Sequence, residues 1–351
     1  TTSATVGIAL IGIAEALGIS VGMTAGAILS GAYFGDKLSP LSDTTNLAPA
    51  MAGTDLFTHI RYMTLTTVPT ITITLIIFVI IGFNLDTTGT TDTSAILASI
   101  EKSFTISPWL FLVPAIVIAL IVKKTSPLIA LLLGTLLGAA AALFFQPGIV
   151  AQIAGTTDLN FISGYRGVMQ AITVDTAIET DNKNLNDLFS SGGMAGMLGT
   201  IWLIICAMVF GGIMEAIGAL ARISKALLNL FHTTFGLFAS TVFSCLALNA
   251  TASDQYLAIV VPGKMFAKAY RDKSLAPENL SRALEDSGSV TSVLIPWNTC
   301  GAYHSGVLGV PTLSYAGYAF FNYLSPFMTL LFAAFGIKIK ELSQSAKTQT
   351  A

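Results

Sequence analysis

The sequence predicts an all-α polytopic membrane protein made of two inverted repeats with broken helices. Of its 351 residues, 53% are hydrophobic and only 10% are charged, and the mean hydropathy of +0.75 is that of a membrane protein. Long uncharged stretches alternate with clusters of small polar residues. The formal net charge of −2 gives no sign of a surface that binds nucleic acid.

Five stretches are apolar enough to cross a bilayer, because about 20 apolar residues span the hydrocarbon core as a helix. They are residues 62–83, 108–122 with their flanks, 127–145, 196–218 and 312–336. Residues 70–74 alternate Thr and Ile in the manner of a β-strand, but the uncharged run continues to Gly82, so its length favours a helix. In such a helix the Thr hydroxyls can bond to carbonyls one turn earlier.

Basic residues indicate the side of the membrane, because Lys and Arg accumulate in cytoplasmic loops. The basic tail 338–351 is therefore expected in the cytoplasm, and the polar segment 146–195 is expected as an external loop. Arg222 and the basic stretch 264–273 flank one apolar segment. That segment, 233–265, either crosses the membrane with a break or dips in and returns, and the sequence leaves both open.

A weak internal repeat supports duplication. Ser3 precedes Asp36 by 33 residues, Ser253 precedes Asp286 by 33, and both aspartates begin the pattern Asp-x-x-Ser-x-x-Ser. Transporters built from inverted repeats place their sites at the repeat interface. We expect a first repeat with connecting helices in 1–145 and a second in 196–337. Helices equivalent to 196–248 would then precede residue 1, so the first repeat is expected to be incomplete at its N-terminal end.

Three polar clusters interrupt the apolar segments. Residues 31–46 contain Pro40 among Ser, Asp, Thr and Asn, which compete for backbone bonds, so we expect the helix to unwind there. Residues 284–301 have the same chemistry, and residues 249–255 place Asp254 after an apolar run. Irregular backbone at membrane depth must line a cavity or be buried in protein. Its oxygen atoms suit a hard cation.

These clusters predict a site at which a cation and a proton compete for the same carboxylates. Desolvation favours the protonated carboxylate and a bound cation favours the ionised one. The residues that we expect to bind the ion or couple the proton are Asp36, Asp43, Asp254, Asp286, Ser39, Ser42, Thr45, Asn46, Ser253, Ser289, Ser292, Asn298 and Thr299.

The alternative is that these residues are interfacial helix caps, with Asp36 and Asp43 at N-caps and Lys37 as an exposed neighbour. The same combination of Ser, Thr, Asn and Asp in all three clusters favours an ion-binding site over helix caps. Among the histidines, His304 follows the second cluster and is the candidate for pH modulation. His59 and His232 are expected at the surface.

Two of the clusters resemble a known family. Residues 30–48, SGAYFGDKLSPLSDTTNLA, are similar to the signature of the NhaC-type sodium/proton antiporters, and LEDSG at 284–288 with IPWNTCG at 295–301 resembles that family's second motif. The resemblance implies a multi-pass protein of the bacterial inner membrane with re-entrant hairpins, which exchanges Na+ for H+ by alternating access. It also implies that residues 1–5 are the remnant of a polar segment that completes the first broken helix.

Family membership leaves the cargo open, since some relatives exchange malate and protons for lactate and sodium. Organic acids, and Li+ beside Na+, therefore remain alternatives, and a homodimer is one of the oligomeric states allowed. An intramembrane aspartyl protease is disfavoured because Gly35-Asp36 lacks the glycine pattern of such enzymes, and repeated broken helices favour a carrier over a channel. No cofactor is expected. The three cysteines lack metal-binding spacing.

Overall fold

The computed structural model describes residues 3–40, 42–85, 100–123, 125, 127–178, 189–230 and 233–342. The chain divides into two compact units, each of which is described by itself. The first comprises Thr1–Ala14, Ile19–Asp86 and Thr200–Ala351, and the second comprises Glu15–Gly18 and Thr87–Gly199. His232 lies outside the described residues, so its expected surface position stays a prediction.

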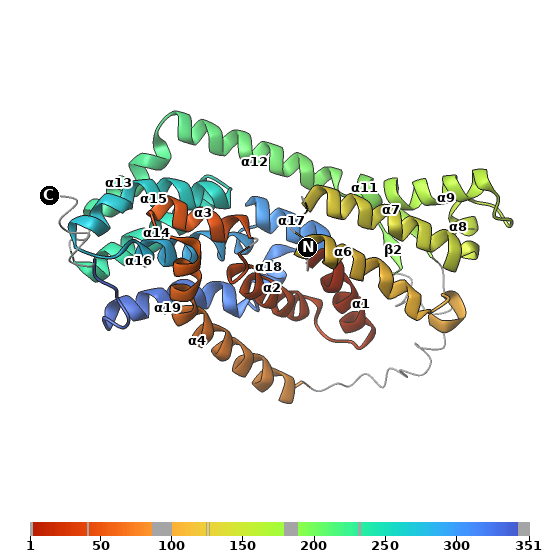
Figure 1. Ribbon diagram of the computed structural model, residues 1–351, viewed down its shortest axis with the longest axis horizontal. Helices are drawn as coiled ribbons and strands as arrows, with labels where there is room; N and C mark the ends of the chain where they lie inside the picture. The colour runs from red at the N-terminus through yellow and green to blue at the C-terminus, as the bar shows by residue number, and fades with distance from the viewer. Residues whose placement is uncertain are drawn as a thin grey trace. The chain divides into compact units, whose positions relative to one another are not determined.

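The second unit is a small group of apolar helices (Figure 1). Its elements are η2 (Pro108–Phe111), α6 (Leu112–Val122), α7 (Pro127–Phe145), α8 (Pro147–Ile153), α9 (Phe161–Thr173), β1 (Thr176–Ala177), β2 (Ser190–Ser191) and α11 (Gly193–Gly196). The axis bends by 106° between α7 and α8, where Pro147 begins the new helix. The segment expected as an external loop thus contains short helices, and the side that it faces stays a prediction.

The first unit contains the polar clusters. Its N-terminal elements are η1 (Ser3–Gly7), α1 (Ile8–Ala16), α2 (Val21–Lys37), α3 (Asp43–Ala52) and α4 (Leu56–Phe83). The later ones are α12 (Leu198–Ala216), α13 (Ala219–Leu230), α14 (Thr234–Thr251), α15 (Gln255–Asp272), α16 (Pro277–Leu284), η3 (Glu285–Ser289), η4 (Ser292–Leu294), α17 (Thr299–Leu308), α18 (Thr312–Ala316) and α19 (Phe320–Ala334). Figure 1 shows α3 beside α14, α15 and α16, and buried side chains of all four share one apolar cluster.

Several helices of the described chain are long and apolar enough to cross a membrane. They are Leu56–Phe83, Gly193–Ala216 and Thr234–Thr251, and the bent α7–α8 pair would be a further, broken span. The prediction of one helix over 312–336 is wrong, because residues 317–319 separate α18 from α19. At this break α2 passes so closely that a Cβ on Gly26 would lie 2.5 Å from the carbonyl carbon of Tyr318.

Helix α4 has its polar face inside and its apolar face outside, as a membrane helix beside a polar site requires. Thr66, Thr70 and Thr74 are buried at intervals of one turn, whereas Ile76 and Val79 are exposed. The hydroxyls of Thr70 and Thr74 donate to the carbonyls four residues earlier, at 2.7 and 2.8 Å. Both the helix and this bonding pattern confirm the sequence prediction.

Helices α14 and α15 form a hairpin, so residues 233–265 do not continue in one direction, and how far this hairpin enters the membrane stays a prediction. The ring of Phe238, near the start of α14, lies 5.3 Å from that of Tyr270, near the end of α15. The chain therefore reverses at residues 252–254 and returns. The start of α14 and the end of α15 thus lie close together.

Candidate ion-binding site

The first polar cluster breaks the helix where the sequence predicts. Helix α2 ends at Lys37, and Ser42 caps α3 by accepting from the backbone N–H of Thr45. The Thr45 hydroxyl donates to the carbonyls of Asp36 and Lys37, each at 3.3 Å. Asn46 Nδ2 donates to the carbonyls of Pro40 and Ser42, at 2.9 and 2.6 Å. Thr45 and Asn46 thus bind backbone carbonyls on both sides of the break.

The second cluster continues α16 as the π-helical turn η3, in which every residue is buried. Asn249 Nδ2, at the end of α14, donates to the carbonyl of Gly288 at 2.7 Å. Asn322 Nδ2, on α19, donates to that of Val290 at 2.8 Å. Two buried asparagines from neighbouring helices therefore hold this irregular backbone in place.

The third cluster is the tip of the α14–α15 hairpin. Ser253 has a φ of 60°, a left-handed conformation that is strained for a residue other than glycine. Its carbonyl accepts from the backbone N–H of Thr299 at 2.9 Å. Asp254 caps α15, because its Oδ1 accepts from the N–H groups of Tyr256 and Leu257 at 2.8 and 3.1 Å. The hairpin tip thus contacts the start of α17.

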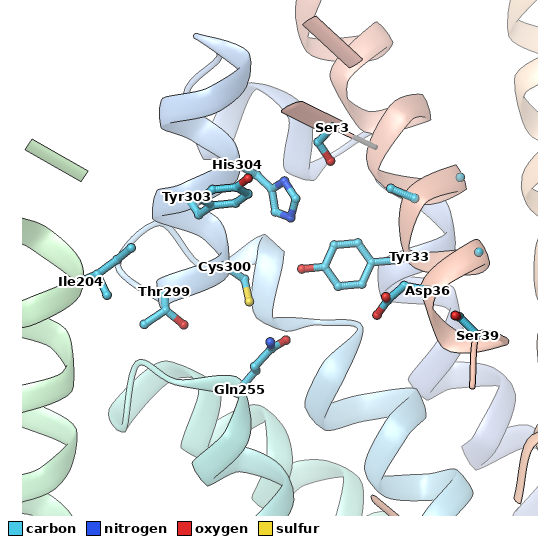
Figure 2. Close-up of a pocket in the computed structure, with 13 residues that line it drawn as sticks. Ser3, Tyr33, Asp36, Ser39, Ile204, Gln255, Thr299, Cys300, Tyr303 and His304 are labelled. Carbon is cyan, nitrogen blue, oxygen red and sulfur yellow. The ribbon is translucent and has the colours of Figure 1, made fainter. Parts of the chain in front are cut away.

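The three clusters border one cavity of about 590 Å³ in the first unit. Its walls come from η1, α2, α12, α15 and α17, and Figure 2 shows Tyr33 projecting into it opposite Cys300, with Gln255 and His304 on either side. Asp36 is the carboxylate on the wall. Of the predicted ion-binding residues, Asp36, Ser39 and Thr299 line this cavity, together with His304.

His304, the candidate for pH modulation, faces this cavity. Its ring packs against those of Tyr33 and Tyr303, with centroids 5.7 and 5.2 Å away. Its Nδ1 is buried without a hydrogen-bond partner in the described part of the chain. The structure places His304 beside the candidate site, and its role in pH modulation stays a prediction.

Asp286 is not on the cavity wall but is sealed inside the protein. It pairs with Lys37, and its Oδ2 accepts from the hydroxyl of Thr66 at 2.9 Å and from that of Thr329. Lys37 is 1% exposed and Asp286 is 0% exposed, so the reading of Lys37 as an exposed neighbour is wrong. A cation could bind Asp286 only after Lys37 had withdrawn or lost its charge.

Glu285 is the second sealed carboxylate. Its Oε1 accepts from the hydroxyl of Thr44 on α3 at 3.2 Å, and Ser289 donates to the same Thr44 oxygen at 3.1 Å. Ser42 lies between Thr44 and Asp36, with oxygen distances of 3.2 Å to Thr44 and 2.8 Å to Asp36. The exposed carboxylate on the cavity wall and the buried one are thus joined by hydroxyl groups.

The remaining predicted residues have structural partners of their own. Asp43 accepts from the hydroxyl of Tyr256, which joins α3 to α15. The Ser292 hydroxyl donates to the carbonyl of Ser289 at 2.6 Å. Asn298 caps α17 and donates to the carbonyl of Asn249 at 3.1 Å. In the described part of the chain, no group of three or more His, Cys, Asp or Glu side chains could hold one metal ion.

Several residues of the buried network around Glu285 and Asp286 were not singled out from the sequence, although four of them lie within the predicted clusters. They are Lys37, Thr44, Thr66, Asn249, Glu285 and Thr329. The available signal was the spacing of Thr66, Thr70 and Thr74, which places three hydroxyls on one face of an apolar helix. His59 was expected at the surface and is instead fully buried, with its Nδ1 2.8 Å from the Ser281 hydroxyl.

Comparison with known proteins gives one consistent family. Residues 31–337 match the model of the Na+/H+ antiporter family. The chain is 38% identical to the Na(+)/H(+) antiporter NhaC of Alkalihalophilus pseudofirmus over 348 residues, which cover 99% of this chain and 72% of that protein.

Relatives with other cargoes are nearly as similar. The chain is 36% identical to the arginine/ornithine antiporter ArcD of Halobacterium salinarum and 35% identical to the malate-2H(+)/Na(+)-lactate antiporter of Bacillus subtilis. These alignments cover 97% and 96% of this chain and 68% of each relative. No solved structure matches. The family model and the near-complete alignments agree, and the chain belongs to the Na+/H+ antiporter family, whose members are multi-pass membrane transporters.

Proposed function

We propose that this antiporter exchanges Na+ for H+ across the bacterial inner membrane by alternating access. The observation that carries the proposal is the position of Asp36, a carboxylate on the wall of a polar cavity at the point where α2 is broken. The Ser42 hydroxyl donates to Asp36 Oδ2 at 2.8 Å, and Ser39 lines the same wall. Carboxylate and hydroxyl oxygens are the ligands that a hard cation prefers.

Exchange follows from competition at this carboxylate. A carboxylate next to apolar protein is stable when it is either protonated or bound to a cation, and not when it is ionised and alone. Na+ arriving at Asp36 therefore releases a proton, and a proton arriving there releases Na+. Alternating access of the two predicted repeats would expose the loaded site to each side in turn.

The test uses the protein in proteoliposomes, with internal pH followed by a dye after addition of Na+, Li+ or K+. We expect Na+ alone to drive proton movement and Asp36→Asn to abolish it, because Asn can neither lose a proton nor attract the cation. Asp158→Asn, in the second unit, is the matched control. Unchanged exchange in Asp36→Asn would remove that residue from the mechanism.

Organic-acid exchange coupled to Na+ is the second candidate, favoured by the size of the cavity. At about 590 Å³ the cavity is far larger than the roughly 30 Å³ that one water occupies, and two relatives carry names with organic substrates. None of the described lining residues is Lys or Arg, so a carboxylate anion would lack a cationic partner. A proton signal that appears only with malate, lactate or arginine present would favour this candidate over the first.

A further inference from the structure

Glu285 is placed where its carboxyl group can hold a proton away from solvent. Its side chain is 0% exposed at the start of the π-helical turn η3. Its Oε1 accepts from Thr44, whereas Oε2 has no hydrogen-bond partner in the described part of the chain. An ionised carboxylate would leave Oε2 charged, buried and unpaired, which is strongly unfavourable. A protonated carboxyl avoids that charge, so Glu285 is neutral in this conformation.

The charged neighbours do not change this conclusion. Lys37 attracts an ionised Glu285 and Asp36 repels it, but Lys37 is already paired with Asp286. Helix α15, where it packs against η3, presents the apolar Ala258 and Ile259. The elements packed against η3 also carry titratable side chains, which are Asp43 on α3, Cys245 on α14, Tyr256, Lys264, Lys268, Tyr270, Arg271 and Asp272 on α15, Glu278 and Arg282 on α16, and Tyr323 on α19. His59 is on α4, whose Thr66 contacts Asp286.

A continuous series of hydroxyls connects Glu285 to the cavity. From the wall inward, Asp36 Oδ2 lies 2.8 Å from Ser42 Oγ, which lies 3.2 Å from Thr44 Oγ1, which lies 3.2 Å from Glu285 Oε1. Ser42 and Thr44 are buried and Asp36 is exposed. The link from Ser42 to Asp36 has the usual length of a hydrogen bond between oxygen atoms, and the two links of 3.2 Å are slightly longer than that range. Each hydroxyl in the series can both give and accept a proton.

We propose that Glu285 is the proton-storing carboxylate of the exchange and that Ser42 and Thr44 relay the proton between it and Asp36. The step is balanced. The proton of Asp36 moves to Ser42, the hydroxyl proton of Ser42 moves to Thr44, and that of Thr44 moves to Glu285 Oε1. Asp36 is left ionised, Glu285 is left neutral, and both hydroxyls regain one proton.

This inference rests on the proposed function and adds a second carboxylate to it. The stored proton returns from Glu285 through the relay to Asp36 and leaves into the cavity before Na+ binds Asp36, so the two ions are carried in turn. A proton that arrives later protonates Asp36, ejects the cation and passes back to Glu285. The proton is held on the buried Glu285 and the cation, in its turn, on the exposed Asp36, and the hydroxyl relay couples the two carboxylates.

The test compares two transport modes in proteoliposomes. Na+-driven proton movement requires the relay, whereas exchange of radioactive Na+ for unlabelled Na+ requires only the cation site. We expect Glu285→Gln to lose about a hundredfold in proton movement, the usual scale for loss of a proton-transfer group, and to keep Na+/Na+ exchange. The exposed Glu215→Gln is the matched control and should keep both modes.

A second pair of variants keeps the test decisive where Glu285→Gln does not fold. Thr44→Val has the same shape without the hydroxyl and should lose proton movement but keep Na+/Na+ exchange, whereas Thr44→Ser, which keeps the hydroxyl, should keep both modes. Normal proton movement in Glu285→Gln or in Thr44→Val would overturn the inference and leave the proposed function intact. Absence of Na+-driven proton movement in the unaltered protein would instead defeat the proposed function.

Discussion

Lys37 and Asp286 form an ion pair between α2 and the π-helical turn η3, and neither side chain reaches solvent. The two residues are 249 positions apart in the sequence, so this pair joins the two polar clusters directly. Two threonine hydroxyls, from α4 and α19, complete the surroundings of Asp286. Removal of one member of such a pair typically destabilises a protein by about 3–5 kcal/mol, because the other charge is left buried alone.

The pair should therefore behave as a coupled unit in stability measurements. We expect Lys37→Met and Asp286→Asn each to lower the thermal unfolding midpoint in detergent, because each leaves the other charge buried without its partner. The double variant should recover much of the loss, since neither charge remains. Additive losses in the double variant would show that the two side chains do not depend on each other.

Variants of Asp254 can distinguish a helix-capping role of this residue from an ion-binding role. Its Oδ1 accepts from two backbone N–H groups at the start of α15, and Asn caps a helix about as well as Asp does. We expect Asp254→Asn to keep the fold and most Na+-driven proton movement. Asp254→Ala should lose about 1 kcal/mol of stability, measured by thermal unfolding. A stably folded Asp254→Asn without transport would place Asp254 among the ion ligands, as the sequence analysis predicts.

Much of the architecture could be predicted because it depends on local patterns. Uncharged runs identified most membrane helices, and Pro40 with its polar neighbours located the break after α2. The break between α18 and α19 was missed. Gly26 of α2 packs closely against Tyr318 at this break, and a contact between segments so far apart in the sequence leaves no local pattern.

The residue types of the candidate site could be predicted from the sequence, but the contacts between their side chains could not. The aspartates and hydroxyls of the clusters were identified, but which carboxylate faces the cavity depends on how α2, α3 and η3 pack. Lys37 illustrates the difference: one position after Asp36, it points in another direction and is buried. Neighbours in a helix project about 100° apart, so adjacent residues can have opposite environments.

Arg282 carries the next prediction, because it is buried with Nε, Nη1 and Nη2 all lacking hydrogen-bond partners in the described chain. Its guanidinium lies over the ring of Tyr62 at 4.7 Å and near that of Phe332 at 5.7 Å. We expect Arg282→Lys to unfold at a lower temperature, since an ammonium is more strongly hydrated and stacks less well.

The companion variant is Arg282→Met, which keeps an unbranched chain and removes the charge. We expect its stability to equal or exceed that of the unaltered protein, because hydrophobic replacement of buried charges is often neutral or stabilising. A strong loss of stability in Arg282→Met would mean that the guanidinium has a partner, such as bound water or an anion, that outweighs its desolvation.

Gly301 and Gly35 differ in the space available for a side chain. A Cβ on Gly301, in the first turn of α17, would lie 2.0 Å from the carbonyl oxygen of Ile295, whereas a Cβ on Gly35 would meet no atom within 4 Å. The first contact is with backbone and cannot be relieved by rotating a side chain. We therefore expect Gly301→Ala to destabilise the protein by a few kcal/mol, the range of overpacked cores, and to shift the α17 wall of the cavity. Gly35→Ala, which adds its methyl group in open space at the same cavity, should fold normally. Thermal unfolding of the two variants tests this, and equal midpoints would show that α17 can move away from residue 295 without loss, so that the close approach at Gly301 does not fix the geometry of the site.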